Sequence, residues 1–125
     1  MPSAKPRVLV VDDDLVIRES ISALLVDEGY DVREAANGRQ ALATIDEWLP
    51  DLILLDLMMP IMDGWTFRDR QRDIEAARHI PVIVLSATHN LGQRANGLDA
   101  AAVFPKPFDL DELLGTVERV TAPGL

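Results

Sequence analysis

Short apolar runs that alternate with segments of helical period constrain the fold of this chain more than any other feature. The runs are continuous rather than alternating, which is typical of parallel strands that are buried on both faces. The run at 31–35 is weaker and more polar than the others. We expect five strands, at residues 7–11, 31–35, 52–55, 81–85 and 101–104.

Each expected strand is followed by apolar residues at helical spacing. The first helix is built on residues 17–25 and ends at Gly29, which suits a left-handed helix end. Asn37 can cap the second, and Pro50 ends it. Gly92 and Gly97 each cost about 1 kcal/mol inside a helix, so we expect the fourth helix to be short and weakly formed. The remaining expected helices cover about residues 38–49, 65–77, 89–99 and 110–117, the last one capped by Asp109.

Five strand–helix pairs with short connections predict a doubly wound α/β fold with a five-stranded parallel sheet and five helices. Its 125 residues fit one domain, and nothing along the chain resembles a linker or a low-complexity segment. We therefore expect a single domain over 1–125, with a core at about 7–120.

Polar side chains stand where four of the expected strands end. Asp12 and Asp13 follow the first strand, Asp56 the third, Ser86 the fourth and Lys106 the fifth. Ligands of open α/β sheets bind at the carboxyl ends of the strands, near the point where the strand order reverses. We expect all five side chains to meet in one crevice there, although each of them alone has an ordinary structural explanation.

The expected cluster predicts a metal site of hard oxygen ligands. Three close carboxylates repel one another unless a proton or a cation neutralises them. With neither histidine nor cysteine among them, the donor set favours Mg²⁺, or Mn²⁺, over zinc. A metal, an ammonium and a hydroxyl together suit phosphoryl transfer. Asp14 and Asp109 are expected instead to cap helices.

Charge and composition exclude several classes of function. The net charge of −9 argues against nucleic-acid binding, which needs a basic surface. The absence of cysteine excludes disulfides and thiolate chemistry. No apolar run reaches the roughly 20 residues of a membrane span, and the first six residues do not resemble a secretion signal. We expect a cytoplasmic protein without membrane insertion.

Four motifs, in this order, resemble the receiver domain of bacterial two-component response regulators. The resemblance spans about residues 7–120 and implies the flavodoxin-like, CheY-like fold with strand order 2-1-3-4-5. The motifs are Val10-Val11-Asp12-Asp13, Leu54 to Pro60 followed by Met62-Asp63-Gly64, Leu85-Ser86-Ala87, and Lys106-Pro107-Phe108.

The resemblance implies a role for each residue of the cluster. Asp56 is the phosphoacceptor, which takes a phosphoryl group from a sensor histidine kinase or a histidine phosphotransfer protein. Asp13, Asp56 and the backbone carbonyl of Met58 ligate Mg²⁺, and Asp12 acts through a metal-bound water. Lys106 and the Ser86 hydroxyl contact the phosphoryl oxygens.

Further implications concern the surroundings of this cluster. The resemblance implies a cis Lys106–Pro107 peptide, and positions Met58 and Thr88 that tune loss of the phosphoryl group. The family usually has Tyr or Phe three residues before the lysine, as a switch, whereas this chain has Val103. Phe104 should point to the opposite face. We therefore expect signalling through movement of residues 86–98.

Two other classes share parts of this pattern. A haloacid-dehalogenase-like phosphohydrolase also forms an aspartyl phosphate, but it needs a second aspartate where this chain has Met58. A pseudo-receiver keeps the fold for protein binding, but usually loses the acidic pair, the acceptor or the lysine. We expect a signalling domain rather than an enzyme. Its output passes to a downstream protein or an effector domain, and a stand-alone regulator and a receiver cut from a longer protein remain equally open.

Overall fold

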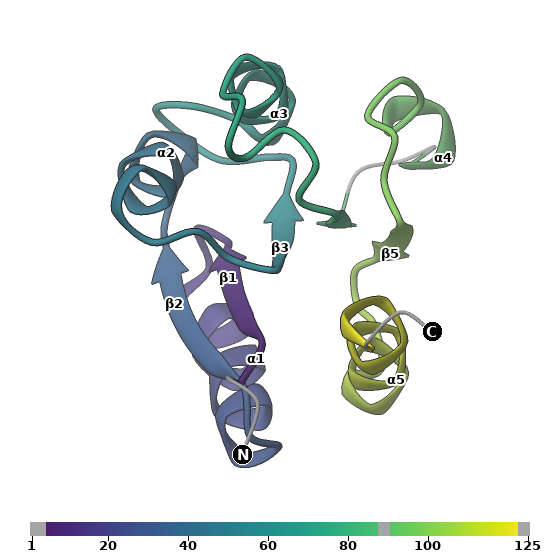
Figure 1. Cartoon of the computed structure of the whole chain (residues 1–125). Helices are drawn as coiled ribbons and strands as arrows, with labels where there is room; N and C mark the ends of the chain where they lie inside the picture. Colours follow the sequence, from purple (N-terminus) through teal and green to yellow (C-terminus); the bar gives the residue numbers. More distant parts are fainter. Residues whose placement is uncertain (1–4, 88–90, 123–125) are drawn as a thin grey trace.

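The computed structural model describes residues 5–87 and 91–122, and these form a central sheet covered by helices on both faces (Figure 1). Within this part of the chain, five parallel strands pair in the order β2-β1-β3-β4-β5, as predicted. The strands are β1 (Arg7–Val11), β2 (Asp31–Ala35), β3 (Leu52–Asp56), β4 (Val82–Ser86) and β5 (Ala102–Pro105).

Helices of nine residues or more follow four of these strands. Their first turns are capped by Asp14, Asn37, Asp63 and Asp109, whose side chains accept hydrogen bonds from backbone N–H groups. Gly29 ends the first helix at φ 96°, a left-handed conformation that glycine adopts without steric cost. These helices are α1 (Leu15–Asp27), α2 (Gly38–Glu47), α3 (Gly64–Arg72) and α5 (Leu110–Thr121).

The fourth helical segment is much shorter than the others. In the described residues α4 covers only Leu91–Arg94, shorter than the expected range 89–99, so the predicted count of five helices is not confirmed. Gly97 follows at φ 87°, which no right-handed helix contains, and limits the segment at its carboxyl side. Thr88, expected to tune loss of the phosphoryl group, and His89, expected to begin this helix, lie outside the described residues.

Two helix ends were predicted too late in the sequence. α2 stops at Glu47 rather than near Leu49, because Trp48 turns to an extended conformation and is buried. α3 stops at Arg72 rather than near Ala77. The buried Gln71 side chain donates hydrogen bonds to the backbone oxygens of Ala77 and Ile80, and these bonds fold the following segment back as turns.

Alternating residues of the strands build two cores. Leu9 and Val11 of β1 face α2 and α3, whereas Val8 and Val10 face α1 and α5. Figure 1 shows the same arrangement, with α2, α3 and α4 above the sheet and α1 and α5 below it. The central strands β3 and β4 are buried along their whole length, which explains why their sequences are continuously apolar.

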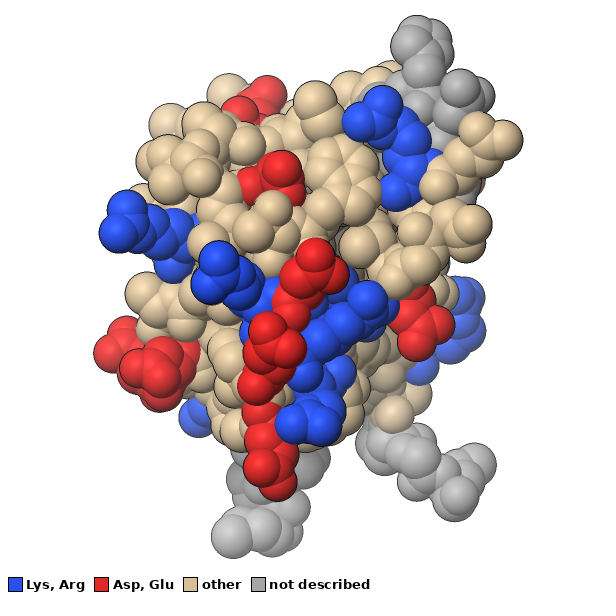
Figure 2. Space-filling model, turned by 90° about the horizontal axis from the view of Figure 1, so that it is seen from above, with Lys and Arg blue, Asp and Glu red and all other residues tan. Residues whose placement is uncertain are grey.

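The outer surface is charged without a broad patch of one sign where α2, α3 and α4 cover the sheet. On this face acidic and basic side chains lie next to one another (Figure 2). None of the described helices is long and apolar enough to cross a membrane.

Candidate metal centre

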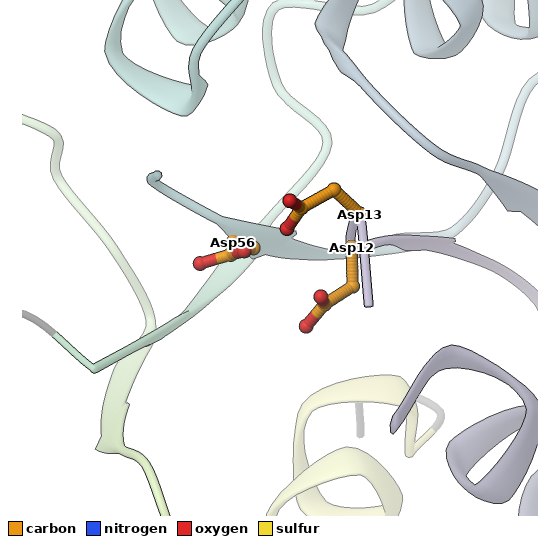
Figure 3. A group of neighbouring side chains, drawn as sticks. All are labelled: Asp12, Asp13 and Asp56. Atoms are coloured by element: carbon orange, nitrogen blue, oxygen red, sulfur yellow. The ribbon is translucent and has the colours of Figure 1, made fainter. Parts of the chain in front are cut away.

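Three carboxylates converge at the carboxyl edge of the sheet. Asp12 and Asp13 come from the end of β1 and Asp56 from the end of β3, its neighbour in the sheet (Figure 3). One oxygen from each lies within 4.8 Å of the others. The parallel pairing of β1 with β3 brings together residues that are 43 or 44 positions apart in the sequence.

Asp12 is completely buried and is held at four of its atoms. Its backbone N–H continues the ladder to β2 by donating to the oxygen of Ala35, at 3.1 Å. Its carboxylate Oδ1 accepts the backbone N–H of Asp14 at 2.9 Å, and Oδ2 lies 2.7 Å from the ammonium of Lys106. Its backbone oxygen accepts the NH1 of Arg18 at 2.7 Å. The position of this carboxylate is therefore fixed by the fold.

Lys106 provides the positive charge of the cluster. Its Nζ lies 2.7 Å from Oδ2 of Asp12 and 3.5 Å from Oδ2 of Asp56, and its side chain is 12% exposed. Burial alone would lower the pKa of Lys106, but the neighbouring Asp12 and Asp56 outweigh it and raise this pKa. The ammonium is therefore charged and held between two carboxylates. The Lys106–Pro107 peptide is cis, as the resemblance implies.

Asp56 is buried in an environment that opposes its charge. Burial first, and then the negative charge of Asp12, raise the pKa of Asp56 from its ordinary value to about 7, although Lys106 acts in the opposite direction. Its Oδ1 also accepts a long 3.4 Å hydrogen bond from the backbone N–H of Met58. At neutral pH the cluster therefore has an incompletely compensated negative charge.

A cleft of about 500 Å³ opens over these groups. Asp56 forms its floor, and the exposed side chain of Met58 stands at its rim. Ser86, which was also predicted to belong to the site, is completely buried at the end of β4. Its backbone oxygen accepts the N–H of Lys106 at 2.8 Å. The cleft is lined by Asp13, Asp14, Ile17, Asp56, Met58, Ala87, Lys106 and Pro107.

The donor set of the cluster fits a small divalent cation. Mg²⁺ binds oxygen at about 2.0–2.1 Å, which places opposite ligands of an octahedron about 4 Å apart. The 4.8 Å spread of the three carboxylate oxygens is close to that value. Because three carboxylates face the single ammonium of Lys106 in this cluster, a cation would also find a favourable electrostatic site here. A cation and Lys106 together could neutralise an anionic group that enters the cleft.

The residue at the usual switch position lies away from this cluster. Val103 and Phe104 face opposite sides of the sheet, as strand alternation predicts. Val103 is 38% exposed and lines a surface hollow with Arg72 and Ala100. Phe104 packs into the core beneath α1 and α5, where its ring meets Phe108 edge to face. Phe104 therefore does not occupy the position of the missing aromatic ring.

The loop between β3 and α3 contains a strained residue. Ile61 has φ 70°, and the N–H of Met62 donates to the oxygen of Pro60 at 2.7 Å across it, which is a γ-turn of the strained kind. The Ile61 side chain is 75% exposed. A β-branched residue in this conformation has a steric cost that no burial offsets.

Relieving this strain should stabilise the protein. We expect Ile61→Gly to raise the free energy of unfolding by about 0.5–1 kcal/mol, because the steric cost exceeds the entropy that glycine adds to the unfolded chain. Urea unfolding measures the difference. Val16→Gly, at an equally exposed apolar residue with helical backbone, should lower stability instead. Equal loss of stability in both variants would contradict the assignment of strain to Ile61.

Sequence reasoning missed one residue that contacts this cluster. Arg18 of α1 bonds the backbone oxygen of Asp12 and the carboxylate of Glu34. The sequence places it on the polar side of the first helix, where an arginine is ordinarily solvated. Its position could have indicated this contact, because Arg18 lies one helical turn after the cap residue Asp14 and therefore close to the end of β1.

Comparison with known proteins identifies close similarity over most of the chain. The family model of the response regulator receiver domain matches residues 8–118. The DNA-binding dual master transcriptional regulator RpaA of Synechocystis is 40% identical over 117 residues, which cover 92% of this chain and 48% of RpaA. Response regulator MprA of Mycolicibacterium vanbaalenii is 44% identical over 116 residues, 91% of this chain and 49% of MprA. The chain spans about half the length of these curated relatives.

A solved structure shows the same architecture with a metal bound. The receiver domain of sensor histidine kinase PA1611 of Pseudomonas aeruginosa superposes with a TM-score of 0.82 and 33% identity. The match covers 93% of this chain and 97% of that domain, which holds a magnesium ion in its active site cleft.

Proposed function

This chain belongs to the family of response regulator receiver domains, and on that premise we propose that it accepts a phosphoryl group on Asp56 in a Mg²⁺-dependent reaction. The donor is a phosphohistidine of a sensor histidine kinase or of a histidine phosphotransfer protein. The observation that carries the proposal is the convergence of Asp12, Asp13 and Asp56 with the ammonium of Lys106 at the edge of one cleft.

The proposed reaction moves a phosphoryl group between two side chains. A carboxylate oxygen of Asp56 attacks the phosphorus, the phosphorus–nitrogen bond to the donor imidazole breaks, and its electron pair stays on the ring nitrogen. The other ring nitrogen of the donor carries a proton before transfer, so the product is an acyl phosphate on Asp56 and a neutral histidine on the donor. Lys106 already lies 3.5 Å from Asp56, so its ammonium can pair with an incoming phosphoryl oxygen. The Ser86 hydroxyl is proposed to donate to another.

Asp13, Asp56 and the backbone carbonyl of Met58 would hold the metal, with Asp12 acting through a bound water. Bound Mg²⁺ supplies neutralisation of the charge that develops on the transferred group. The carboxylate geometry of this chain supports this set, and the magnesium ion in the active site cleft of the PA1611 receiver domain supports the choice of metal. Mn²⁺, which prefers the same hard oxygen ligands, is proposed as a substitute.

The proposed role is that of a signalling domain rather than an enzyme acting on a separate substrate. A phosphohydrolase of the haloacid-dehalogenase type would need an acid two residues after Asp56, and Met58 cannot supply a proton. A pseudo-receiver would not need the paired acidic residues, the acceptor and the lysine that this chain retains. We propose that the domain acts in the cytoplasm.

The surface around the cleft supports a protein as phosphoryl donor. Met58 lines the cleft and is 54% exposed, and the exposed residues Val16 and Leu110 line a neighbouring apolar pocket together with Lys106 and Pro107. Exposed apolar side chains next to a reactive group are typical of a contact surface for a protein partner. We propose that the histidine-bearing domain of the donor packs against these residues, so that its phosphohistidine enters the cleft.

The proposed output passes through another protein or through an effector domain. RpaA and MprA are about twice as long as this chain, so a stand-alone regulator and a receiver joined to an effector are both compatible with it. The net charge of −9 and the mixed charges in Figure 2 support a receiver that does not itself contact nucleic acid.

Intact-mass spectrometry tests the proposal directly. The purified protein, incubated with Mg²⁺ and a small phosphodonor such as acetyl phosphate, should gain one phosphoryl group, and a chelator should prevent the gain. A protein that binds Mg²⁺ but gains no mass from small donors or from phosphorylated histidine proteins would refute the phosphoacceptor function.

Two substitutions in the cluster should differ in their effect on Mg²⁺ affinity. Asp13→Ala removes a proposed ligand and a negative charge, so we expect weaker binding by about tenfold or more. Lys106→Ala removes a competing positive charge, so the affinity should stay equal or rise, although phosphorylation should be impaired. Titration calorimetry with Mg²⁺ measures both. Much weaker binding by Lys106→Ala would show that the proposed ligand geometry is wrong.

A further inference from the structure

Arg18 joins the first helix to the backbone of the acidic pair. Its NH1 donates to the backbone oxygen of Asp12 at 2.7 Å, and its Nε donates to Oε1 of Glu34 at 2.9 Å. The side chain is only 15% exposed, whereas Glu34 is 37% exposed. An arginine in such a two-sided arrangement loses its freedom of rotation, because the planar guanidinium must satisfy both acceptors at once.

The oxygen that Arg18 binds belongs to the peptide unit between Asp12 and Asp13. This unit is planar, so fixing its oxygen fixes the orientation of the whole plane that joins the two residues. On the other side, the N–H of Asp12 is already held by Ala35 of β2. The direction in which the Asp13 side chain leaves the backbone therefore depends on the bond from Arg18.

Asp13 has less support of its own than its neighbour. Asp12 is completely buried and paired with Lys106, but Asp13 is exposed at the cleft. An exposed carboxylate can adopt several rotamers and backbone angles unless its peptide is restrained. The charge-assisted bond from Arg18 restrains this peptide, and such bonds are shorter and stronger than neutral ones.

We infer that Arg18 is a positioning residue of the metal site, which orients Asp13 toward the cation by anchoring the Asp12–Asp13 peptide. The inference rests on the proposed function, because it assumes that Asp13 is a metal ligand. Arg18 touches neither the cation nor the phosphoryl group, and its effect on both passes through the backbone. Glu34 of β2 contributes by holding the guanidinium in place.

The sign of one measurement separates positioning from simple electrostatics. Arg18 is a positive charge close to a cation site, so its removal on charge grounds alone should raise Mg²⁺ affinity. Positioning predicts the opposite, because a misdirected Asp13 is a poorer ligand. Substitution of residues that orient metal ligands typically weakens metal binding by about 10–100-fold.

The experiment compares Mg²⁺ affinities of the full chain and four variants by titration calorimetry. Arg18→Met should bind about tenfold more weakly than wild type. Arg18→Lys should be intermediate, because an ammonium can reach one acceptor but cannot span two. Glu34→Gln, which keeps the guanidinium but loosens its anchor, should show a smaller loss. Arg39→Met removes the same charge from an exposed residue of α2 and should bind at least as tightly as wild type.

A second measurement needs no metal. Hydrogen exchange of the metal-free proteins should be faster at Asp12 and Asp13 in Arg18→Met than in wild type, and unchanged in Arg39→Met. Unaltered exchange there, or Mg²⁺ affinity in Arg18→Met equal to or above that of wild type, would overturn the inference. Should Arg18→Met not fold, wild-type affinity in both Arg18→Lys and Glu34→Gln would overturn it equally. A wild-type protein that binds no Mg²⁺ would instead refute the proposed function itself.

Discussion

Asp56→Asn should abolish phosphorylation of this protein completely. The amide oxygen of asparagine is a poor nucleophile, and the amide is a poorer Mg²⁺ ligand than a carboxylate. Because asparagine has nearly the same shape as aspartate, the fold should be preserved. We expect the phosphoryl gain from acetyl phosphate and Mg²⁺ in wild type and none in the variant, measured by intact mass.

The matched control is Asp46→Asn, an identical chemical change at an exposed residue of α2. It should be phosphorylated as wild type is. A phosphoryl gain in Asp56→Asn equal to that of wild type would remove Asp56 from the acceptor role and would direct attention to another carboxylate of the cluster.

Asp56→Asn should also be more stable than wild type at neutral pH without divalent cations. Burial and Asp12 raise the pKa of Asp56 to about 7, so the folded protein holds a proton that the unfolded chain releases above its ordinary value of 3.8. The contribution of this proton to the free energy of unfolding is fully present below pH 3.8 and is lost as the pH rises through about 7. At pH 8 the loss amounts to a few kcal/mol, on the order of 1.4 kcal/mol for each unit of raised pKa.

Chemical unfolding from pH 4 to pH 8 with a chelator present tests this linkage. Wild type should lose stability relative to Asp56→Asn as the pH rises, and the two curves should meet near pH 4. Adding Mg²⁺ at pH 8 should stabilise wild type much more than the variant, because binding to the folded state alone shifts the unfolding equilibrium. Parallel curves over this whole range would show that Asp56 titrates normally.

The sheet and the acidic cluster could be predicted from the sequence because their signals are local. Every strand except the polar β2 contains a short apolar run, and each site residue stands at the end of a strand or within two residues after it. The order of the strands came from the family resemblance, since no local pattern specifies which strands pair. Given that order, Asp12, Asp13 and Asp56 had to meet, because parallel strands place their carboxyl ends at one edge.

Features that depend on contacts between distant side chains and the backbone could not be predicted. Arg68 of α3 reads as a surface residue of a charged helix, yet it is buried and donates to the backbone oxygen of Leu98 at 2.9 Å and to Oε1 of Gln71 at 2.9 Å. Gln71 in turn ends the helix by bonding the segment that follows it. No spacing rule reveals a buried arginine that bonds a backbone oxygen 30 residues away.

These contacts also bear on how the domain would signal without the usual aromatic switch. Three donors of α3 bind carbonyls around α4: Trp65 binds that of Arg94, Arg68 that of Leu98 and Arg72 that of Gly97. The expected movement of residues 86–98 would either break these hydrogen bonds or require the three α3 side chains to move with their acceptors. We expect Val103 to keep one rotamer meanwhile, because a β-branched side chain is stiff about χ1. Amide shifts and hydrogen exchange, compared with and without a phosphoryl mimic, test this movement.

The close approach of α3 to the acceptor strand has a consequence for the sequences that this fold accepts. A Cβ at Gly64 would lie 2.5 Å from the backbone oxygen of Asp56 and 2.8 Å from Cα of Leu57, and neither backbone atom can move aside without moving the acceptor. At Gly29, a glycine with positive φ, a Cβ meets nothing within 4 Å, so asparagine could replace it at small cost. In a random library selected for phosphorylation, position 64 should therefore return glycine alone, while position 29 returns a mixture.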